Sequence, residues 1–161
     1  MEIRYYHLER ATLEAALPVL LARCLERGWR AVVRAGSAER VEALADHLWT
    51  FDDRSFLPHG SAADGHAAQQ PIWLTDAEEN PNGAAVLFLT DGAEAATLAG
   101  YDLVCRLFDG RDDEAVRAAR AAWKRETAGG AHLTYWRQTA GGWEKQAEKK
   151  PEGAEKPPGS G

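Results

Sequence analysis

Residues 30–49 read RAVVRAGSAERVEALADHLW and place a strand directly before a helix. The first five, RAVVR, are short and β-branched at their centre, which is typical of a buried strand. Ser37 stands where its side chain would cap a helix. Apolar residues then recur at helical spacing, at Val41, Leu44, Ala45, Leu48 and Trp49. A strand that leads into an amphipathic helix in this way is the repeating unit of an α/β domain.

The same alternation continues on both sides of this stretch. Before it we expect a strand at residues 3–8 and a helix at 13–27 that begins late or bends at Pro18. After it we expect strands at residues 72–74, 85–89, 101–108 and 132–137, the last at the sheet edge, and a helix at residues 112–127. Short apolar strands separated by helices predict an α/β fold with a mostly parallel central sheet flanked by helices.

The chain length of 161 residues fits a single domain, which we place at residues 1–143. After Trp143 the sequence EKQAEKKPEGAEKPPGSG holds only charged and small residues, Gln and Pro. Such a composition buries too little apolar surface to offset the entropy of ordering. We therefore expect residues 144–161 to form a flexible charged tail.

Composition limits the surroundings and partners of the chain. Cys24 and Cys105 lie in apolar runs without metal-ligand spacing, which favours buried thiols in a reducing compartment. No window approaches the roughly 20 apolar residues needed to cross a bilayer, and the opening MEIRYYHLER does not resemble a signal peptide. We expect a cytoplasmic protein without membrane contact. The formal charge of −6 argues against broad binding of phosphate backbones, so any contact with nucleic acid should be indirect.

Nucleotide binding is the first function to test for an α/β sheet. A phosphate cradle needs a glycine-rich turn between a strand and a helix, of the form GxxxxGK[ST] or GxGxxG. The first strand ends in HLERATLE, which has no glycine, and the second ends in RAGSAER, which has one. The sequence therefore lacks a phosphate loop, and we expect no cofactor.

Metal-dependent hydrolysis is the alternative function that the sequence leaves open. Imidazole and carboxylate groups gather in one long loop, at Asp52, Asp53, His59, Asp64 and His66. These are usual ligands of a catalytic divalent metal. Their spacing fits no frame such as HExxH, and neighbouring glycines loosen it, so turn-forming loop residues are the simpler interpretation. We predict no catalytic residues and no metal site.

A basic stripe on the last predicted helix is the strongest candidate site. At about 100° per residue, Arg117, Arg120 and Lys124 fall within roughly 60° of one another. Val116 and Trp123 lie at the edge of the stripe. We expect the opposite side to be buried, at Ala115, Ala118, Ala119 and Ala122. Guanidinium groups beside an apolar shelf suit a peptide with acidic side chains, a free carboxylate and a hydrophobic last residue.

Several segments together carry a family resemblance. They are YYHL, RGWRAVVRAGSAERVEALADHLWTFDDRSFLPHG, QPIWLT, ENPNGAAVLFLTDG and YDLVCRLFDG. Their combination resembles the chi subunit of bacterial DNA polymerase III over about residues 3–138. The resemblance implies an α/β fold akin to nucleotide-binding domains without the phosphate loop. It also implies a noncatalytic accessory protein of the clamp-loader assembly. Its expected partners are the psi subunit and the acidic C-terminal tail of single-stranded DNA-binding protein.

The resemblance also assigns roles to residues. Trp49 in HLW and Phe56 in SFLPH resemble the aromatic wall for that tail, so LWTFDDRSFLPHG would be half scaffold and half docking surface. Arg120 and Lys124 resemble the cations of the last helix, with Arg120 on the terminal carboxylate and Trp123 in place of a usual aromatic. We include Arg117 in the tail-binding set, because Val116 stands where some members have a lysine. An adaptor for another acidic-tailed protein remains open.

Overall fold

The structure is a computed structural model that describes residues 1–50 and 57–151. In chain order its elements are β1 (Glu2–Leu8), α1 (Leu13–Glu26), β2 (Ala31–Arg34), α2 (Ala38–Thr50), the short 3-10 helix η1 (Ala67–Gln69), β3 (Ile72–Thr75), β4 (Val86–Leu89), β5 (Leu103–Asp109), α3 (Asp113–Ala128), β6 (His132–Thr139) and β7 (Gly142–Lys149).

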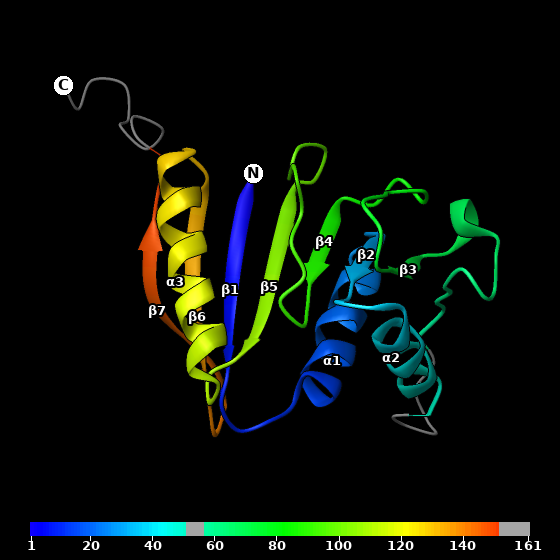
Figure 1. Cartoon of the computed structure of the whole chain (residues 1–161), viewed down its shortest axis with the longest axis horizontal. Coiled ribbons are helices and arrows are strands. Elements are labelled where there is room, and N and C mark those ends of the chain that lie inside the picture. The colour runs from blue at the N-terminus through cyan, green and yellow to red at the C-terminus, as the bar shows by residue number, and fades with distance from the viewer. Residues whose placement is uncertain (51–56, 152–161) are drawn as a thin grey trace.

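The strands of the described residues form one sheet in the order β3-β2-β4-β5-β1-β6-β7 (Figure 1). Neighbouring strands pair in parallel except β6 and β7, which run antiparallel. The predicted α/β class and mostly parallel sheet are therefore confirmed. The strand expected at the sheet edge is β6, and this expectation was wrong because β7 adds beyond it.

The two faces of the sheet carry separate cores, as the alternation of side chains requires. On β1, Tyr6 and Leu8 pack with α1 and α2 in one cluster, whereas Ile3 and Tyr5 pack with α3 in the other. Helices α1 and α2 thus cover one face and α3 covers the opposite one. Figure 1 shows α3 over the β1 and β6 end of the sheet and α2 near the β2 and β3 end.

Strand β7 corrects the boundary of the predicted tail. The structure pairs residues 142–149 with β6, although residues 144–149 were expected to be flexible. Backbone hydrogen bonds hold this strand, and Trp143 adds an edge-on contact with the ring of Tyr6, at 5.0 Å between centroids. A charged sequence can form an edge strand because the ladder uses backbone groups, and charges at the edge discourage further pairing. Residues 152–161 lie outside the described part of the chain, so the rest of the tail stays a prediction.

Pro18 lies inside α1 without delaying its start. The helix begins at Leu13, capped by the side chain of Thr12. Proline has no N–H to donate to the carbonyl four residues earlier, which belongs to Glu14. His47 of α2 places its Nε2 atom 2.6 Å from this carbonyl oxygen and supplies the missing donor. The proline thereby links α1 to α2.

We predict that His47→Ala lowers the free energy of unfolding by about 1 kcal/mol beyond any packing loss, because the Glu14 carbonyl loses its donor. In a Pro18→Ala background, the new N–H of residue 18 can bond that carbonyl, so His47→Ala should cost less there. Urea denaturation of the four proteins in a double-mutant cycle measures the difference. An equal cost in both backgrounds would show that the histidine does not compensate for the proline.

Candidate functional site

Helix α3 presents three cations without partners on its outer side. The side chains of Arg117, Arg120 and Lys124 are exposed, and none makes a hydrogen bond or ion pair within the described residues. Arg125, by contrast, lies 3.6 Å from a carboxylate oxygen of Glu94. The predicted basic stripe is therefore present and unneutralised, which leaves it available to an acidic ligand.

A cluster of aromatic rings lies between α3 and the sheet, next to this stripe. We call it the aromatic cluster, and its members are Tyr5, His7, Phe108, Trp123 and Tyr135. The Trp123 ring meets the edges of Tyr5 and Tyr135, at 5.2 and 6.0 Å between centroids. All members except Tyr5 are half-buried. Trp123 thus contributes to packing against the sheet as well as to the surface beside the cations.

The charges of Arg120 and Arg137 act on two members of the aromatic cluster. Burial lowers the pKa of His7; Glu9 raises it, while the positive charges of Arg137 and Arg120 lower it further. Burial raises the pKa of Tyr135, and the same two arginines oppose that shift. Both guanidinium groups therefore lie within electrostatic reach of the aromatic cluster.

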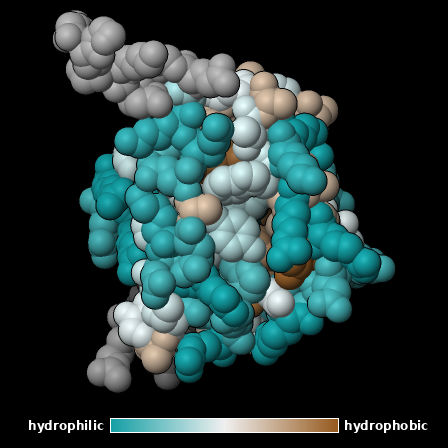
Figure 2. Space-filling model, turned by 90° about the vertical axis from the view of Figure 1, so that its left-hand side faces the viewer, coloured by the Kyte–Doolittle hydropathy of each residue, from teal (hydrophilic) through white to brown (hydrophobic). Residues whose placement is uncertain are grey.

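Sequence reasoning missed the contribution of β6. Leu133, Tyr135 and Arg137 alternate along the strand and share its α3 side. Arg137 is exposed and forms an ion pair with Glu9 at 2.6 Å, so it is a weaker candidate ligand than the unpaired cations. The alternation of side chains along residues 132–137 could have identified these three residues as one face of the strand. It would also have been necessary to know that α3 covers that face. Figure 2 views the side formed by α3, β6 and β7 and shows a band of intermediate hydropathy between hydrophilic margins.

The buried side of α3 differs from the predicted one. Ala119 and Ala122 are buried as expected, but the third buried position is Glu126, while Ala118 is exposed and Ala115 half-buried. Glu126 accepts hydrogen bonds from Arg106 of β5 and from the hydroxyl of Tyr5. The ion pair between Glu126 and Arg106, and not the run of alanines, therefore determines which side of α3 is buried.

The structure does not bring Trp49 to the cations of α3. Trp49 lies in the last turn of α2, and this helix covers the face of the sheet opposite to α3. Helix α2 contacts β3, and β3 is separated from β6 by more than four strand spacings of about 4.8 Å. Trp49 is 51% exposed, and its ring centroid lies 4.5 Å from that of His59. Phe56 lies outside the described residues. Trp49 therefore does not share a surface with Arg117, Arg120, Trp123 and Lys124, and its part in tail binding stays a prediction.

The histidines of the long loop do not assemble a metal site from the described residues. His59 is buried, with Nδ1 2.6 Å from the carbonyl oxygen of Leu57 and Nε2 2.9 Å from that of Ala45. Both ring nitrogens are thus engaged by the backbone. His66 is exposed, and Asp52 and Asp53 lie outside the described range. Within that range no three metal-ligating side chains come together.

The turn after β1 is closed by a side chain of the protein itself. The backbone N–H groups of Glu9, Arg10 and Ala11 all donate to the amide oxygen of Gln138, at 3.2, 2.9 and 2.9 Å. Successive N–H groups at the end of a first strand are the groups that hold phosphates in nucleotide-binding folds. Gln138 of β6 occupies them here, which agrees with the lack of a phosphate loop in the sequence.

Comparison with known proteins agrees with the resemblance seen in the sequence. Residues 1–134 match the family described as DNA polymerase III chi subunit, HolC. A protein of Rickettsia prowazekii (strain Madrid E), named probable DNA polymerase III subunit chi, is 32% identical over 93 residues, which cover 58% of this chain and 56% of that protein. The chain spans about half the length of this curated relative. The family match includes the whole of α3.

We predict that Glu126→Gln lowers the free energy of unfolding by about 3 kcal/mol, because it removes the charge that pairs with a buried arginine. Arg106 and Glu126 are each only 8% exposed. Glu114→Gln on the same helix is the matched control: its exposed side chain has no partner among the described residues, so the loss should stay below about 1 kcal/mol. Chemical denaturation measures both, and equal losses would contradict a central role for the pair.

Proposed function

The chain belongs to the chi-subunit family of DNA polymerase III, and from this premise we propose that it is a noncatalytic accessory subunit of the replicative polymerase. In this role it links the clamp loader, through the psi subunit, to the acidic C-terminal tail of single-stranded DNA-binding protein. Its contact with nucleic acid is then indirect, and its place is the cytoplasm. No helix among the described residues is long and apolar enough to cross a membrane.

One observation supports the tail-binding part above all others. Arg117, Arg120 and Lys124 are exposed on α3 without partners among the described residues, and the charge of Arg120 acts on two members of the aromatic cluster. An acidic peptide that ends in a hydrophobic residue presents the complementary groups. These groups are the acidic side chains along the peptide, the carboxylate at its C-terminus, and the apolar side chain of its last residue.

The proposed pose follows from the positions of the cations. We assign the terminal carboxylate to Arg120, as the family resemblance implies, and its charge also acts on Tyr135 and His7. The hydrophobic last side chain then packs on the half-buried rings of Trp123 and Tyr135. Arg117 and Lys124, about one turn away on either side, attract the acidic side chains that precede it.

We predict that Arg120→Ala weakens binding of a peptide copy of the tail by about 2–5 kcal/mol, the usual cost of removing a charge-paired anchor. Lys124→Ala should weaken it less and chiefly reduce its salt sensitivity. Arg23→Ala is the matched control, since Arg23 is exposed on α1, on the opposite face of the sheet. Isothermal titration of each variant with the free-acid peptide measures these differences.

The same titration with a C-terminally amidated peptide tests the role of Arg120. Amidation removes the charge that this residue would hold, so it should weaken wild type strongly and Arg120→Ala little. Equal binding of the two peptides to wild type would overturn the assignment. A pull-down with single-stranded DNA-binding protein, intact and without its last residues, tests whether this protein, and not another acidic-tailed protein, is the partner.

We also predict that the protein alone binds single-stranded DNA weakly or not at all at physiological salt. The reason is the net charge of −6 together with a basic surface on α3 of only a few cations. Fluorescence anisotropy of a labelled oligonucleotide provides the measurement. Submicromolar affinity would contradict an indirect contact with nucleic acid.

A further inference from the structure

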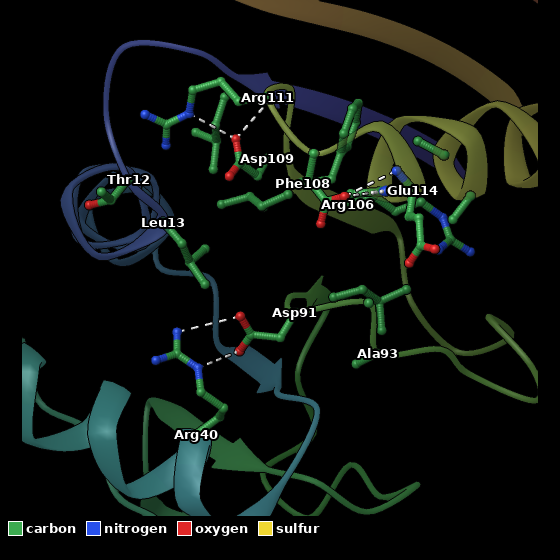
Figure 3. A pocket seen from close by; sticks show the side chains of 18 of the residues that line it. Thr12, Leu13, Arg40, Asp91, Ala93, Arg106, Phe108, Asp109, Arg111 and Glu114 are labelled. Atoms are coloured by element: carbon green, nitrogen blue, oxygen red, sulfur yellow. Dashed lines mark hydrogen bonds and ion pairs between the residues drawn. The ribbon is translucent and has the colours of Figure 1, made fainter.

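A second surface lies on the far side of α3 from Arg120. A cavity of about 610 Å³ opens outside the carboxyl ends of β1, β4 and β5, between the amino-terminal turns of α1 and α3 (Figure 3). Its volume falls in the range of about 300–1,000 Å³ that is usual for ligand sites. Ala118 lines it, and two residues of helix turn about 200°, so Ala118 and Arg120 face opposite ways.

The cavity lies where the chain topology opens the sheet. After β1 the chain crosses to β2 by α1 on one face, and after β5 it crosses to β6 by α3 on the other. Because adjacent strands send their helices to opposite faces, a crevice remains between the two helices. This topological position commonly binds ligands in open α/β sheets. The position predicts a site but does not identify its ligand.

The arginines of the cavity are already neutralised. Arg40 is held by Asp91 and by Glu14, at 3.0 and 2.8 Å, and Arg111 by Asp109 at 3.0 Å. Arg106 is held by Glu94 and Glu126. Figure 3 shows the pair of Arg40 with Asp91 on one side of the opening and the pair of Arg111 with Asp109 on the other. Each of these guanidinium groups therefore already has a carboxylate partner.

Carboxylates outnumber guanidinium groups in the lining. The acidic residues are Glu14, Asp91, Glu94, Asp109, Asp112 and Glu114, against the three arginines. Asp112 caps α3 by accepting from the backbone N–H groups of Glu114 and Ala115, and Thr12 caps α1 by accepting from that of Ala15. Glu114 is exposed, and its carboxylate has no partner among the described residues. This surplus of negative charge repels phosphates and acidic peptides and attracts cations.

The walls of the cavity are apolar, whereas its rim is acidic. Leu8, Leu13, Leu89, Phe108, Ala115 and Ala118 supply carbon surface from three strands and two helices. The small side chains of α3 leave the space open. We propose that this crevice, which we call the switch-point crevice, docks a partner protein through a segment that places an apolar side chain between α1 and α3 and a neighbouring Lys or Arg on the acidic rim.

This docking does not depend on the proposed tail binding, because the two surfaces occupy opposite sides of α3 and carry opposite charge. One helix can therefore hold an acidic ligand on its stripe and a basic ligand at its amino-terminal end at the same time. The two partners would be brought together without competing. That is the property an adaptor requires.

Peptide selection tests the proposal directly, because it requires only the chemistry of the docked segment and not the identity of the partner. Random peptides displayed on phage are selected on the immobilised full chain, and each retained peptide is titrated against wild type, Ala118→Trp, Glu114→Gln and Arg120→Ala. Ala118→Trp fills the crevice from an exposed position, and Ala93→Phe, from the loop after β4, fills the same space if the first variant does not fold.

We expect a class of peptides that lose binding to Ala118→Trp but keep it to Arg120→Ala. These should carry an apolar residue next to Lys or Arg and bind Glu114→Gln about two- to fivefold more weakly, as removal of an exposed charge pair does. Peptides that lose binding only to Arg120→Ala report on the stripe instead. The proposal is overturned if no peptide responds to filling the crevice, or if those that respond are acidic or uncharged.

Discussion

The buried ion pair between Arg106 and Glu126 determines how α3 sits on the sheet. Arg106 comes from β5, in the middle of the sheet, and Glu126 from the last turn of α3, and each is almost fully buried. The hydroxyl of Tyr5 donates to the same carboxylate. A charged group that is buried must keep its partners, because leaving either one alone costs several kcal/mol, on the order of 3–5. The pair therefore fixes which side of α3 faces the sheet.

That rotation decides what each side of α3 does. With Glu126 inward, Ala119 and Ala122 lie on the sheet and the cations at 117, 120 and 124 lie outside. The same rotation takes Ala118 out of the core and into the wall of the switch-point crevice. Tyr5 connects the pair to the aromatic cluster through Trp123. The stripe, the cluster and the crevice are thus consequences of one buried contact.

The order of elements could be read from the sequence because it depends on local patterns. Alternating apolar strands and amphipathic helices were sufficient for the α/β class, and the 100° spacing was sufficient for the basic stripe. The buried side of α3 could not be predicted in the same way, since an alanine run looks like the natural core face. The partner that buries Glu126 lies 20 residues away, on another element. The separation of Trp49 from the cations of α3 could not be predicted for a similar reason, because the spacing of residues along one helix does not specify the order of strands in the sheet.

Strand β7 and Gln138 both depend on backbone hydrogen bonds, which amino-acid composition does not predict. Residues 144–149 offer almost no apolar surface, yet they pair with β6 because a ladder needs only N–H and C=O groups. Gln138 likewise satisfies three N–H groups of the turn after β1, where a nucleotide-binding protein would hold a phosphate. With those donors used and the arginines of the crevice paired, the fold keeps the position of a nucleotide site without its chemistry. What remains there is an apolar cavity with an acidic rim, a surface suited to recognising a protein segment rather than a phosphate.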